Sequence, residues 1–260
     1  MRKLLLAGVA VGALAAGGSA RAADLPMPMN PYTAPPPPMA FSWSGCSVGG
    51  HVGWGWSTTR FRDAFGGSSA SLIDFSGFGR SASANGNGVL GGGQLGCDYQ
   101  FSPWFVAGVQ FSAAGSGISG SSVDPFAFGS SLQSKTDFLA DISLRLGFAW
   151  DHFLFYGKGG AAWVNNNYNF NVSPAAAALG ATSASGSDTP FGAIAGVGVE
   201  WAFAPNWSTF LEYDHFFIGT NTVTFNSAGF INLVSVRQDI DTVKLGVNYR
   251  FNFWREPYPY

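Results

Sequence analysis

Eight charged residues recur at alternate positions of this sequence, among glycine and other small or polar residues, and they are the first candidates for chemistry. They are Asp98, Asp141, Arg145, Lys158, Glu200, Glu212, Lys244 and Arg250. Two neighbouring carboxylates, such as Glu200 and Glu212, could act as the acid and base of glycoside hydrolysis. No substrate cleft accompanies this pair, and basic partners are available for both carboxylates. The sequence therefore favours a network of structural ion pairs over a catalytic pair.

Other residues capable of chemistry are too scattered to form a site. His51, His152 and His215 fall in three different segments, whereas a metal ion needs ligands that converge on one point. None of these histidines has a convincing serine partner for nucleophilic catalysis. The glycine-rich stretch 88–96 lacks the lysine and the strand–loop–helix context of a phosphate loop. We therefore expect no enzyme activity, no metal ion and no cofactor.

The elements that must position the charges are indicated by strict alternation. In VKLGVNYRF, residues 243–251, apolar side chains alternate with polar or very small ones, which predicts a β-strand with two unlike faces. Seven earlier segments repeat this pattern. Charged residues make up only 11% of the chain and aromatic residues 16%, which fits neither a disordered chain nor a charge-covered soluble protein. The sequence thus predicts an all-β protein with eight antiparallel strands in an up-and-down meander.

The connections between the predicted strands alternate in length. Three are short turns, at 102–104, 151–152 and 204–206, and two of them contain proline, which suits a tight turn. The others are rich in Gly, Ser, Ala and Asn and are expected at roughly 57–86, 114–136, 165–189 and 219–235. Short turns at one end and long loops at the other are typical of a transmembrane β-barrel of the outer membrane.

The two faces of the strands indicate which side meets lipid. An eight-stranded barrel is only wide enough to be filled by side chains, so aromatic rings from eight strands would overfill its interior. With the polar faces inside, glycine leaves room and the four basic residues can pair with the four acidic ones. The apolar faces then meet lipid, and aromatic residues near the strand ends form the interface girdles. These residues are Trp54, Trp56, Tyr99, Trp104, Trp150, Trp201, Trp207, Tyr213 and Tyr249.

The two cysteines share the lipid-facing parity of neighbouring strands. Pairing Trp56 with Asn87 across the first loop places Cys46 opposite Cys97, near the short-turn end of the barrel. Because the periplasm is oxidising, we hypothesise a cross-strand disulfide between them. The alternative is two free thiols that act as small lipid-facing hydrophobic residues.

The N-terminal residues indicate the compartment. Arg2 and Lys3 precede an apolar run too short to span a membrane, and residues 20–22 fit the cleavage rule of a secretory signal peptide. The mature chain would keep 10 basic and 15 acidic residues, a net charge of −5, so it lacks a basic footprint for nucleic acid. We predict a signal peptide at 1–22, a Pro-rich periplasmic lead segment at 23–40, the barrel at 41–253 and a short extension at 254–260.

Three stretches carry a resemblance to a known family. They are FSWSGCSVGGHVGWGW (41–56), FGAIAGVGVEWAFAPNWSTFLEYDHF (191–216) and VKLGVNYRF (243–251). They resemble the alphaproteobacterial outer-membrane proteins of the Omp25/Omp31 group (RopB type), opacity-type barrels similar to the membrane domain of OmpA. The resemblance covers 41–253. It implies a surface-exposed, immunogenic protein with a role in envelope integrity and no catalytic motif; some relatives are porin-like and some bind haem.

The chain departs from this family in two places. The family usually ends at the aromatic residue that corresponds to Phe251, which the barrel-assembly machinery recognises, whereas here residues 252–260 follow. The recognised residue is then expected to be Phe251, Phe253 or Tyr260. In addition, Cys46 and Cys97 stand where the family typically has aromatic residues.

Three functions remain open from the sequence. The first is a structural barrel and surface antigen in the outer membrane, reached after secretion to the periplasm. The second is a narrow porin for small solutes or ions, which an unpaired ring of charges would favour. The third is an adhesin or haem-binding protein, for which the loops offer Tyr168 as an axial ligand. The expected partners are outer-membrane lipid and lipopolysaccharide, the barrel-assembly machinery, and a host or small-molecule ligand at the loops.

Overall fold

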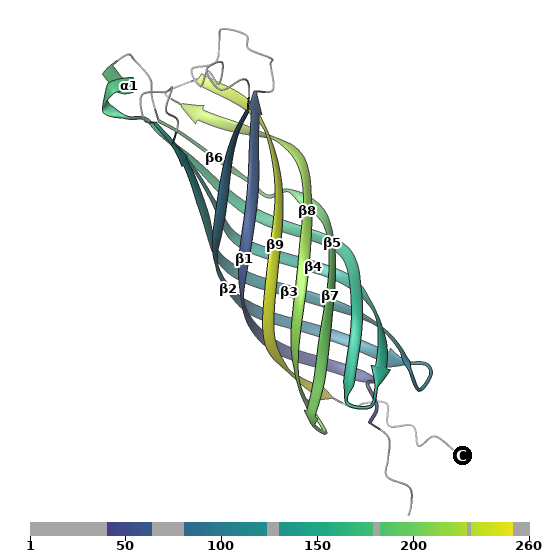
Figure 1. The fold of residues 1–260 in the computed structure, drawn as a ribbon. Coiled ribbons are helices and arrows are strands. Elements are labelled where there is room, and N and C mark those ends of the chain that lie inside the picture. The colour runs from purple at the N-terminus through teal and green to yellow at the C-terminus, as the bar shows by residue number, and fades with distance from the viewer. Residues whose placement is uncertain (1–40, 64–80, 124–129, 179–182, 228–229, 252–260) are drawn as a thin grey trace, which may run out of the picture. The chain divides into compact units, whose positions relative to one another are not determined.

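The computed structural model describes residues 41–63, 81–123, 130–178, 183–227 and 230–251, which all fall in one compact unit, Ala40–Tyr260. Nearly all of them lie in strands (Figure 1). The strands are β1 (Gly45–Asp63), β2 (Ser81–Gln100), β3 (Phe105–Val123), β4 (Ser131–Trp150), β5 (Phe153–Asn171), β6 (Ala184–Asp188), β7 (Phe191–Ala204), β8 (Trp207–Ser227) and β9 (Phe230–Phe251). A five-residue helix, α1 (Pro174–Ala178), follows β5. No helix within these ranges is long and apolar enough to cross a membrane.

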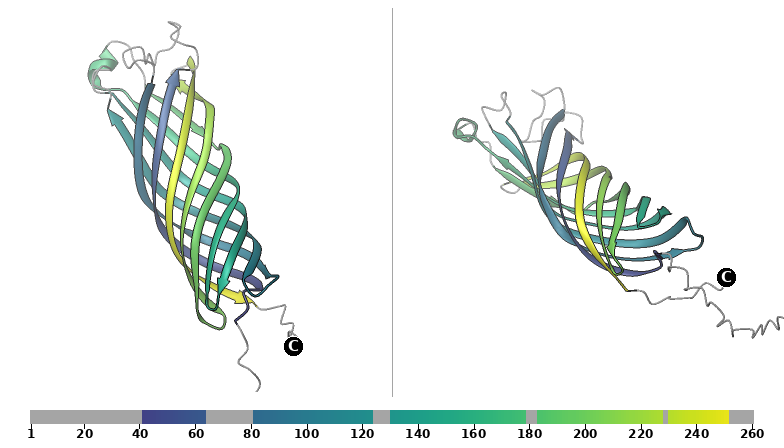
Figure 2. Two further views of the ribbon diagram at one scale, coloured as in Figure 1. Left: turned by 45° about the vertical axis from the view of Figure 1, so that its right-hand side comes forward. Right: turned by 60° about the horizontal axis from the view of Figure 1, so that its bottom comes forward.

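The strands close into a barrel. Successive strands pair antiparallel, and β1 pairs with both β2 and β9, which joins the two ends of the sheet. The short β6 pairs with β5 and β8, and β7 pairs with the same two strands further along. Together β6 and β7 therefore fill one position of an eight-stranded antiparallel barrel. The closed barrel is seen from two further directions in Figure 2. The predicted fold class is confirmed.

Short turns gather at one end of the barrel, called here the turn end, and the opposite end is the loop end. Residues 101–104, 151–152 and 205–206 connect the strands at the turn end, as predicted. In one of the two two-residue turns, Asp151 has a positive φ of 51°, a conformation that aspartate tolerates better than most residues.

The lengths predicted for the loops are wrong, because the strands continue far into them. β1 runs to Asp63 and β2 begins at Ser81, and the pairing of these strands is continuous from Arg62–Ser81 down to Gly45–Asp98. The outward faces turn polar here, with Thr58 and Asn85 above the aromatic residues. Backbone hydrogen bonding needs no lipid, so pairing extends where the apolar alternation has already ended.

The outward face carries the apolar residues, as predicted. Leu144, Leu146 and Trp150 on β4 are each about two-thirds exposed. On the same strand, outward Phe138 and Phe148 are ten residues apart, which is about 33 Å along the strand. Because the strands are tilted by roughly 40° from the barrel axis, this is about 25 Å along the axis. This matches the height of a lipid-facing apolar band. Outward aromatic side chains thus form an upper ring toward the loop end, which includes Trp56 and Phe138, and a lower ring toward the turn end, which includes Phe148 and Trp150. The membrane-spanning part of the barrel lies between these two rings.

Candidate functional site

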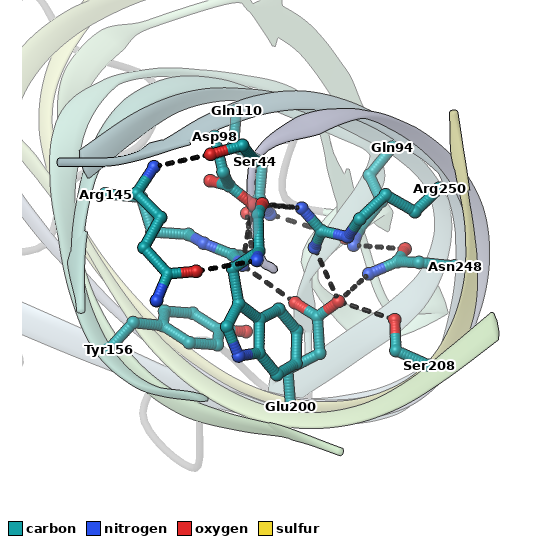
Figure 3. A network of polar contacts seen from close by, with 12 residues as sticks. Ser44, Gln94, Asp98, Gln110, Arg145, Tyr156, Glu200, Ser208, Asn248 and Arg250 are labelled. Carbon is teal, nitrogen blue, oxygen red and sulfur yellow. Dashed lines mark hydrogen bonds and ion pairs between the residues drawn. The ribbon is translucent and has the colours of Figure 1, made fainter. Parts of the chain in front are cut away.

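The lumen of the barrel is filled by side chains in layers, beginning with four charged residues near the turn end. The Arg145 guanidinium lies 3.1 Å from Asp98 and 2.8 Å from Glu200. The guanidinium of Arg250 lies 3.2 Å from each of the same two carboxylates. Figure 3 shows Asp98 and Glu200 on opposite sides of the lumen with Arg250 between them. This lower ion layer has two positive and two negative groups and is neutral.

Hydrogen bonds complete the coordination of the lower ion layer. Ser208 and Asn248 donate to Glu200 Oε1 at 2.6 and 3.2 Å. Gln94 in turn donates to Asn248 at 2.9 Å, and Arg145 donates to Gln110 at 3.4 Å. Glu200 is thus bound by two guanidinium groups, a hydroxyl and an amide, and its side chain is completely buried. A buried carboxylate is tolerated only with partners of this kind.

A second charged layer lies next to the first, toward the loop end. Lys158 lies 2.9 Å from Glu212, 3.1 Å from Asp214 and 3.6 Å from Asp141. Lys244 lies 2.8 Å from Glu212 and 2.6 Å from Asp214. This upper ion layer joins two ammonium groups to three carboxylates. Both lysines act as bridges, which fits an ammonium group with three donors.

Inward glycines explain how side chains from different strands meet. Asp98 on β2 and Arg145 on β4 are both register partners of Gly108 on β3. Lys158 on β5 and Asp214 on β8 likewise flank Gly196 on β7. Because the glycine between them has no side chain, each pair can reach across one strand, a span of roughly 10 Å between outer strands.

Two further contacts follow the same arrangement. Tyr156 and Glu212 flank Gly198, and the tyrosine hydroxyl donates to Glu212 at 2.9 Å. The guanidinium carbon of Arg145 lies over the ring of the same tyrosine, 4.2 Å from the ring centroid. Tyr156 therefore connects the two ion layers, through its ring to the lower one and through its hydroxyl to the upper one.

Trp43 closes the lumen at the turn end. It is fully buried in a cluster with Val106, Ala149, Leu154, Tyr156 and Ala202. Its indole N–H donates to the Asp151 carbonyl at 3.3 Å, and its backbone carbonyl accepts a short hydrogen bond from Arg250. The Arg250 guanidinium also lies 5.1 Å from the indole ring. The segment that precedes β1 thus folds into the mouth of the barrel.

Two uncharged layers fill the lumen on the loop side of the ions. The first is apolar and consists of Ile118, Leu139, Ala162, Val164, Ile194, Phe216, Ile218 and Ile240, all buried. The second is a triangle of hydrogen bonds: Thr136 donates to Asn166 at 2.7 Å, Asn166 to Gln238 at 2.6 Å, and Gln238 back to Thr136 at 3.2 Å. An ion that crossed the barrel would have to displace every one of these layers.

All eight charged residues singled out in the sequence lie in the two ion layers. Asp214 was not among these eight, although it alternates with Glu212 on the same inward face and could have been added to them from that spacing. It also missed Trp43, which lies before the first alternating segment and carries no periodic signal. Ser208 and Asn248 were missed as well, because small and amide side chains on an inward face look like generic lumen residues.

The histidines, Tyr168 and the terminal aromatic residues are distributed as follows. His51 lies on β1, His152 in the turn before β5 and His215 on β8. Across the described ranges, no cluster of three or more His, Cys, Asp or Glu side chains is arranged to hold a metal ion. Tyr168 lies within β5 and is only 2% exposed, so the expectation that it sits on a loop is wrong. Phe251 ends β9 on the outward face, whereas Phe253 lies outside the described residues.

Cys46 and Cys97 are direct cross-strand partners, and the structure joins them in a disulfide. The register that places them together also pairs Trp56 with Asn87, so the predicted register is confirmed. The bond lies on the outward face near the turn end, in the lowest part of the β1–β2 pair. It links β1 and β2, between which lies the longest internal run of residues outside the described ranges, 64–80.

We expect the disulfide to stabilise the barrel. A cross-link between residues 51 positions apart is worth about 2–4 kcal/mol of unfolding free energy. The double variant Cys46→Ser/Cys97→Ser should unfold at correspondingly lower urea concentration, and reduced wild-type protein should behave like the variant. Alkylation of the folded, unreduced protein should label neither cysteine; labelling of both would show that the native protein carries free thiols.

Comparisons with known proteins give consistent relatives. A family model described as outer membrane protein beta-barrel domain matches residues 5–251. The 31 kDa outer-membrane immunogenic protein of Brucella melitensis biotype 1 is 29% identical over 255 residues, 96% of this chain and 100% of the relative. Among solved structures, OprG from Pseudomonas aeruginosa is 14% identical, with 80% of this chain and 96% of the other covered and a TM-score of 0.46. The outer membrane protease OmpT from Escherichia coli is 10% identical, with 83% and 99% covered and a TM-score of 0.48.

Proposed function

This chain belongs to the outer membrane protein beta-barrel domain family, and on that premise we propose that it is a closed structural barrel. Its role would be to strengthen the outer membrane and to display its loops at the cell surface. In this family the turn end faces the periplasm and the loop end faces outward. Trp43 would then close the periplasmic mouth, and the Pro-rich lead segment expected at 23–40 would be periplasmic after removal of a signal peptide.

The observation that carries this proposal is the filling of the lumen by complementary charges. Arg145, Arg250, Lys158 and Lys244 each contact at least two carboxylates within 3.2 Å. A conducting pore needs a path whose lining groups an ion can reach, and water-filled porins have about sixteen strands rather than eight. The geometry therefore supports a structural barrel over the narrow porin.

Surface display is supported by the loop end and by the relatives. The strands extend beyond the upper aromatic ring with polar outward faces, as β1 does from Thr58 to Arg60, so the barrel would project above the membrane. The Brucella relative is named an outer-membrane immunogenic protein, which fits a protein exposed to the outside. Display of an epitope requires exposure only and no pocket. A haem-binding role is not supported, since Tyr168 is buried.

We also propose that the barrel is not an enzyme. Two described histidines lie beside a carboxylate: His152 in a turn, 2.7 Å from its neighbour Asp151, and His215 on the outer wall, whose Nδ1 lies 2.6 Å from Asp241. We consider His215 as the stronger candidate. Its register partners are Ala195 and Asp241, and neither is a nucleophile. Tyr213 also donates to Asp241 at 2.6 Å. The arrangement is better explained as a polar cluster at the membrane interface than as a catalytic triad.

Deletion of the gene in its native bacterium tests the proposed function. We expect the deletion strain to become more sensitive to detergent and to large antibiotics, and the wild-type gene to restore resistance. A variant in which residues 64–80 are replaced by a short Gly–Ser linker should restore resistance equally well but should lose binding of antibodies raised against that segment to intact cells. Unchanged resistance together with slower uptake of small solutes would instead favour the narrow porin.

A further inference from the structure

Two arginines face each other on the outer wall of the barrel, where β1 pairs with β9. Arg60 and Arg237 are direct register partners, and both side chains are exposed. Like charges directly opposite each other destabilise a sheet. The structure places a carboxylate near this pair, that of Asp239, 3.7 Å from Arg237. Asp241, two residues further along β9 toward the turn end, is already bound by Tyr213 and His215. Within the described part of the chain, the pair thus keeps an excess of positive charge.

The height of the arginine pair corresponds to the lipid headgroups. Arg60 lies four residues beyond Trp56 of the upper aromatic ring, which is about 13 Å along the strand and about 10 Å along the membrane normal. The polar headgroup region adds roughly 5–8 Å to each side of the hydrocarbon core. Arginine binds phosphate through two parallel hydrogen bonds. The backbone of the pair therefore lies just above this region, and because a long arginine side chain can extend along an apolar wall, its guanidinium group can reach the phosphates of an outer-leaflet lipid.

A shallow apolar groove lies below the arginines on the same wall of the barrel. It has a volume of about 820 Å³ and is lined among others by Val52, Trp54, Val89, Gly91 and Gly115. These residues come from β1, β2 and β3, and β9 contributes Val243 and Leu245. The groove therefore begins beside Trp54 on the strand that also carries Arg60.

The glycines of this groove differ from those of the lumen. A Cβ added at Gly91 or Gly115 would meet no atom closer than 3.7 Å, whereas one added at Gly196 would overlap Asp214 and lie 2.8 Å from the Tyr213 carbonyl. Packing of the barrel therefore requires glycine at Gly196 but not at Gly91 or Gly115. Glycine within a strand costs stability relative to alanine. Because Gly91 and Gly115 carry no side chain, the wall stays open at this place, and we infer that the groove can hold an apolar chain of a molecule outside the barrel.

We propose that this wall binds one molecule of phosphorylated lipid A, the lipid anchor of lipopolysaccharide. A phosphate would be bound by Arg60 and Arg237, and an acyl chain would lie in the groove past Trp54. The proposal rests on the outer-membrane location of the family and is independent of whether the lumen conducts. It assigns a defined site to a lipid that would otherwise surround the barrel without preference.

Binding of purified lipid A to the folded protein in detergent micelles tests the headgroup part of the site. Folding of each variant is checked by the change in gel mobility on boiling. We expect Arg60→Gln/Arg237→Gln to weaken binding of bis-phosphorylated lipid A by about tenfold or more, and dephosphorylated lipid A to bind the wild type as weakly. The control Lys135→Gln removes an exposed lysine from β4 that pairs with Asp137 at 2.6 Å and should leave the binding of lipid A unchanged.

Equal binding of lipid A by the wild type and the double variant would overturn the proposal. If the double variant did not fold, Arg60→Gln alone would decide.

The groove is tested separately with matched glycine substitutions. Gly115→Leu would fill the groove, while Gly159→Leu would add the same side chain to the outward face of β5, where a Cβ also has room. We expect the first to weaken binding of lipid A by several-fold and the second to leave it unchanged. Inorganic phosphate should compete only weakly with lipid A, since it lacks the acyl chain. Equal effects of the two leucines, or full competition by phosphate, would contradict a lipid site.

Discussion

Replacement of Glu200 by alanine is expected to lower the free energy of unfolding by about 3–5 kcal/mol, the range for removing one partner of a buried ion pair. Glu200 is contacted by Arg145, Arg250, Ser208 and Asn248. Without it, two buried guanidinium groups share the single carboxylate of Asp98. Urea titration of the protein folded in phospholipid bilayers, followed by tryptophan fluorescence, measures the change.

Two further variants separate the ion pair from a general effect of mutation. Asp137→Asn breaks the exposed pair with Lys135 and should change stability by less than about 1 kcal/mol. The double variant Glu200→Leu/Arg145→Met removes one charge of each sign and leaves the contact between Asp98 and Arg250. We expect it to recover about 1–3 kcal/mol relative to the sum of the single effects. Strict additivity would show that Glu200 and Arg145 do not act as a pair.

Gly196→Ala is expected to destabilise the barrel by about 2–3 kcal/mol, the upper range for overpacking a filled interior. The added methyl group would lie between Lys158 and Asp214 and only 2.8 Å from the Tyr213 carbonyl oxygen. It would therefore strain the sheet or push apart the ion pair that crosses this position. The same urea titration, combined with the gel-mobility assay for folding, detects either outcome.

Gly157→Ala provides the matched control. Gly157 lies on the outward face of β5, opposite Val197, and a Cβ there would meet nothing closer than 3.9 Å. Because alanine loses less conformational entropy than glycine on folding, this variant should be neutral or more stable by about 0.5 kcal/mol. If both alanines had equal effects, inward glycine would not be required for contacts across the lumen.

The alternation of residues was sufficient to predict much of this fold. In strands such as VKLGVNYRF each side chain has only two directions, and an eight-stranded barrel has no room for the aromatic face inside. The choice of face therefore followed from volume, together with the pairing of the charges on the polar faces. The register of β1 and β2 was also accessible, because Trp56 and Asn87 mark equivalent ends of two segments and Cys46 then meets Cys97.

The loop end could not be predicted in the same way. Above the upper aromatic ring, the outward residues of a strand are polar, as loop residues are. The sequence of β1 beyond Trp56 therefore has no feature that distinguishes strand from loop. Pairing there is maintained by backbone hydrogen bonds, which leave no mark on residue types. The expected loop at roughly 57–86 was too long for this reason.

The partners within the lumen also depend on information that alternation does not hold. Arg145 and Lys158 are register partners on β4 and β5, yet Arg145 contacts the lower ion layer and Lys158 the upper one. Which way each side chain turns is set by the tilt and stagger of all the strands. The charges could therefore be assigned to the lumen, but not to their layers.

The most direct test of a closed structural barrel is the conductance of the refolded, heat-modifiable protein in a planar lipid bilayer. The two ion layers, the apolar layer and Trp43 together predict no unitary current steps from the wild type. Trp43→Ala alone should remain silent, since it leaves the ion layers and the apolar layer intact. Reproducible unitary steps from the wild type, changed in size when Arg145 or Lys158 is neutralised, would contradict this account and identify the barrel as a narrow pore.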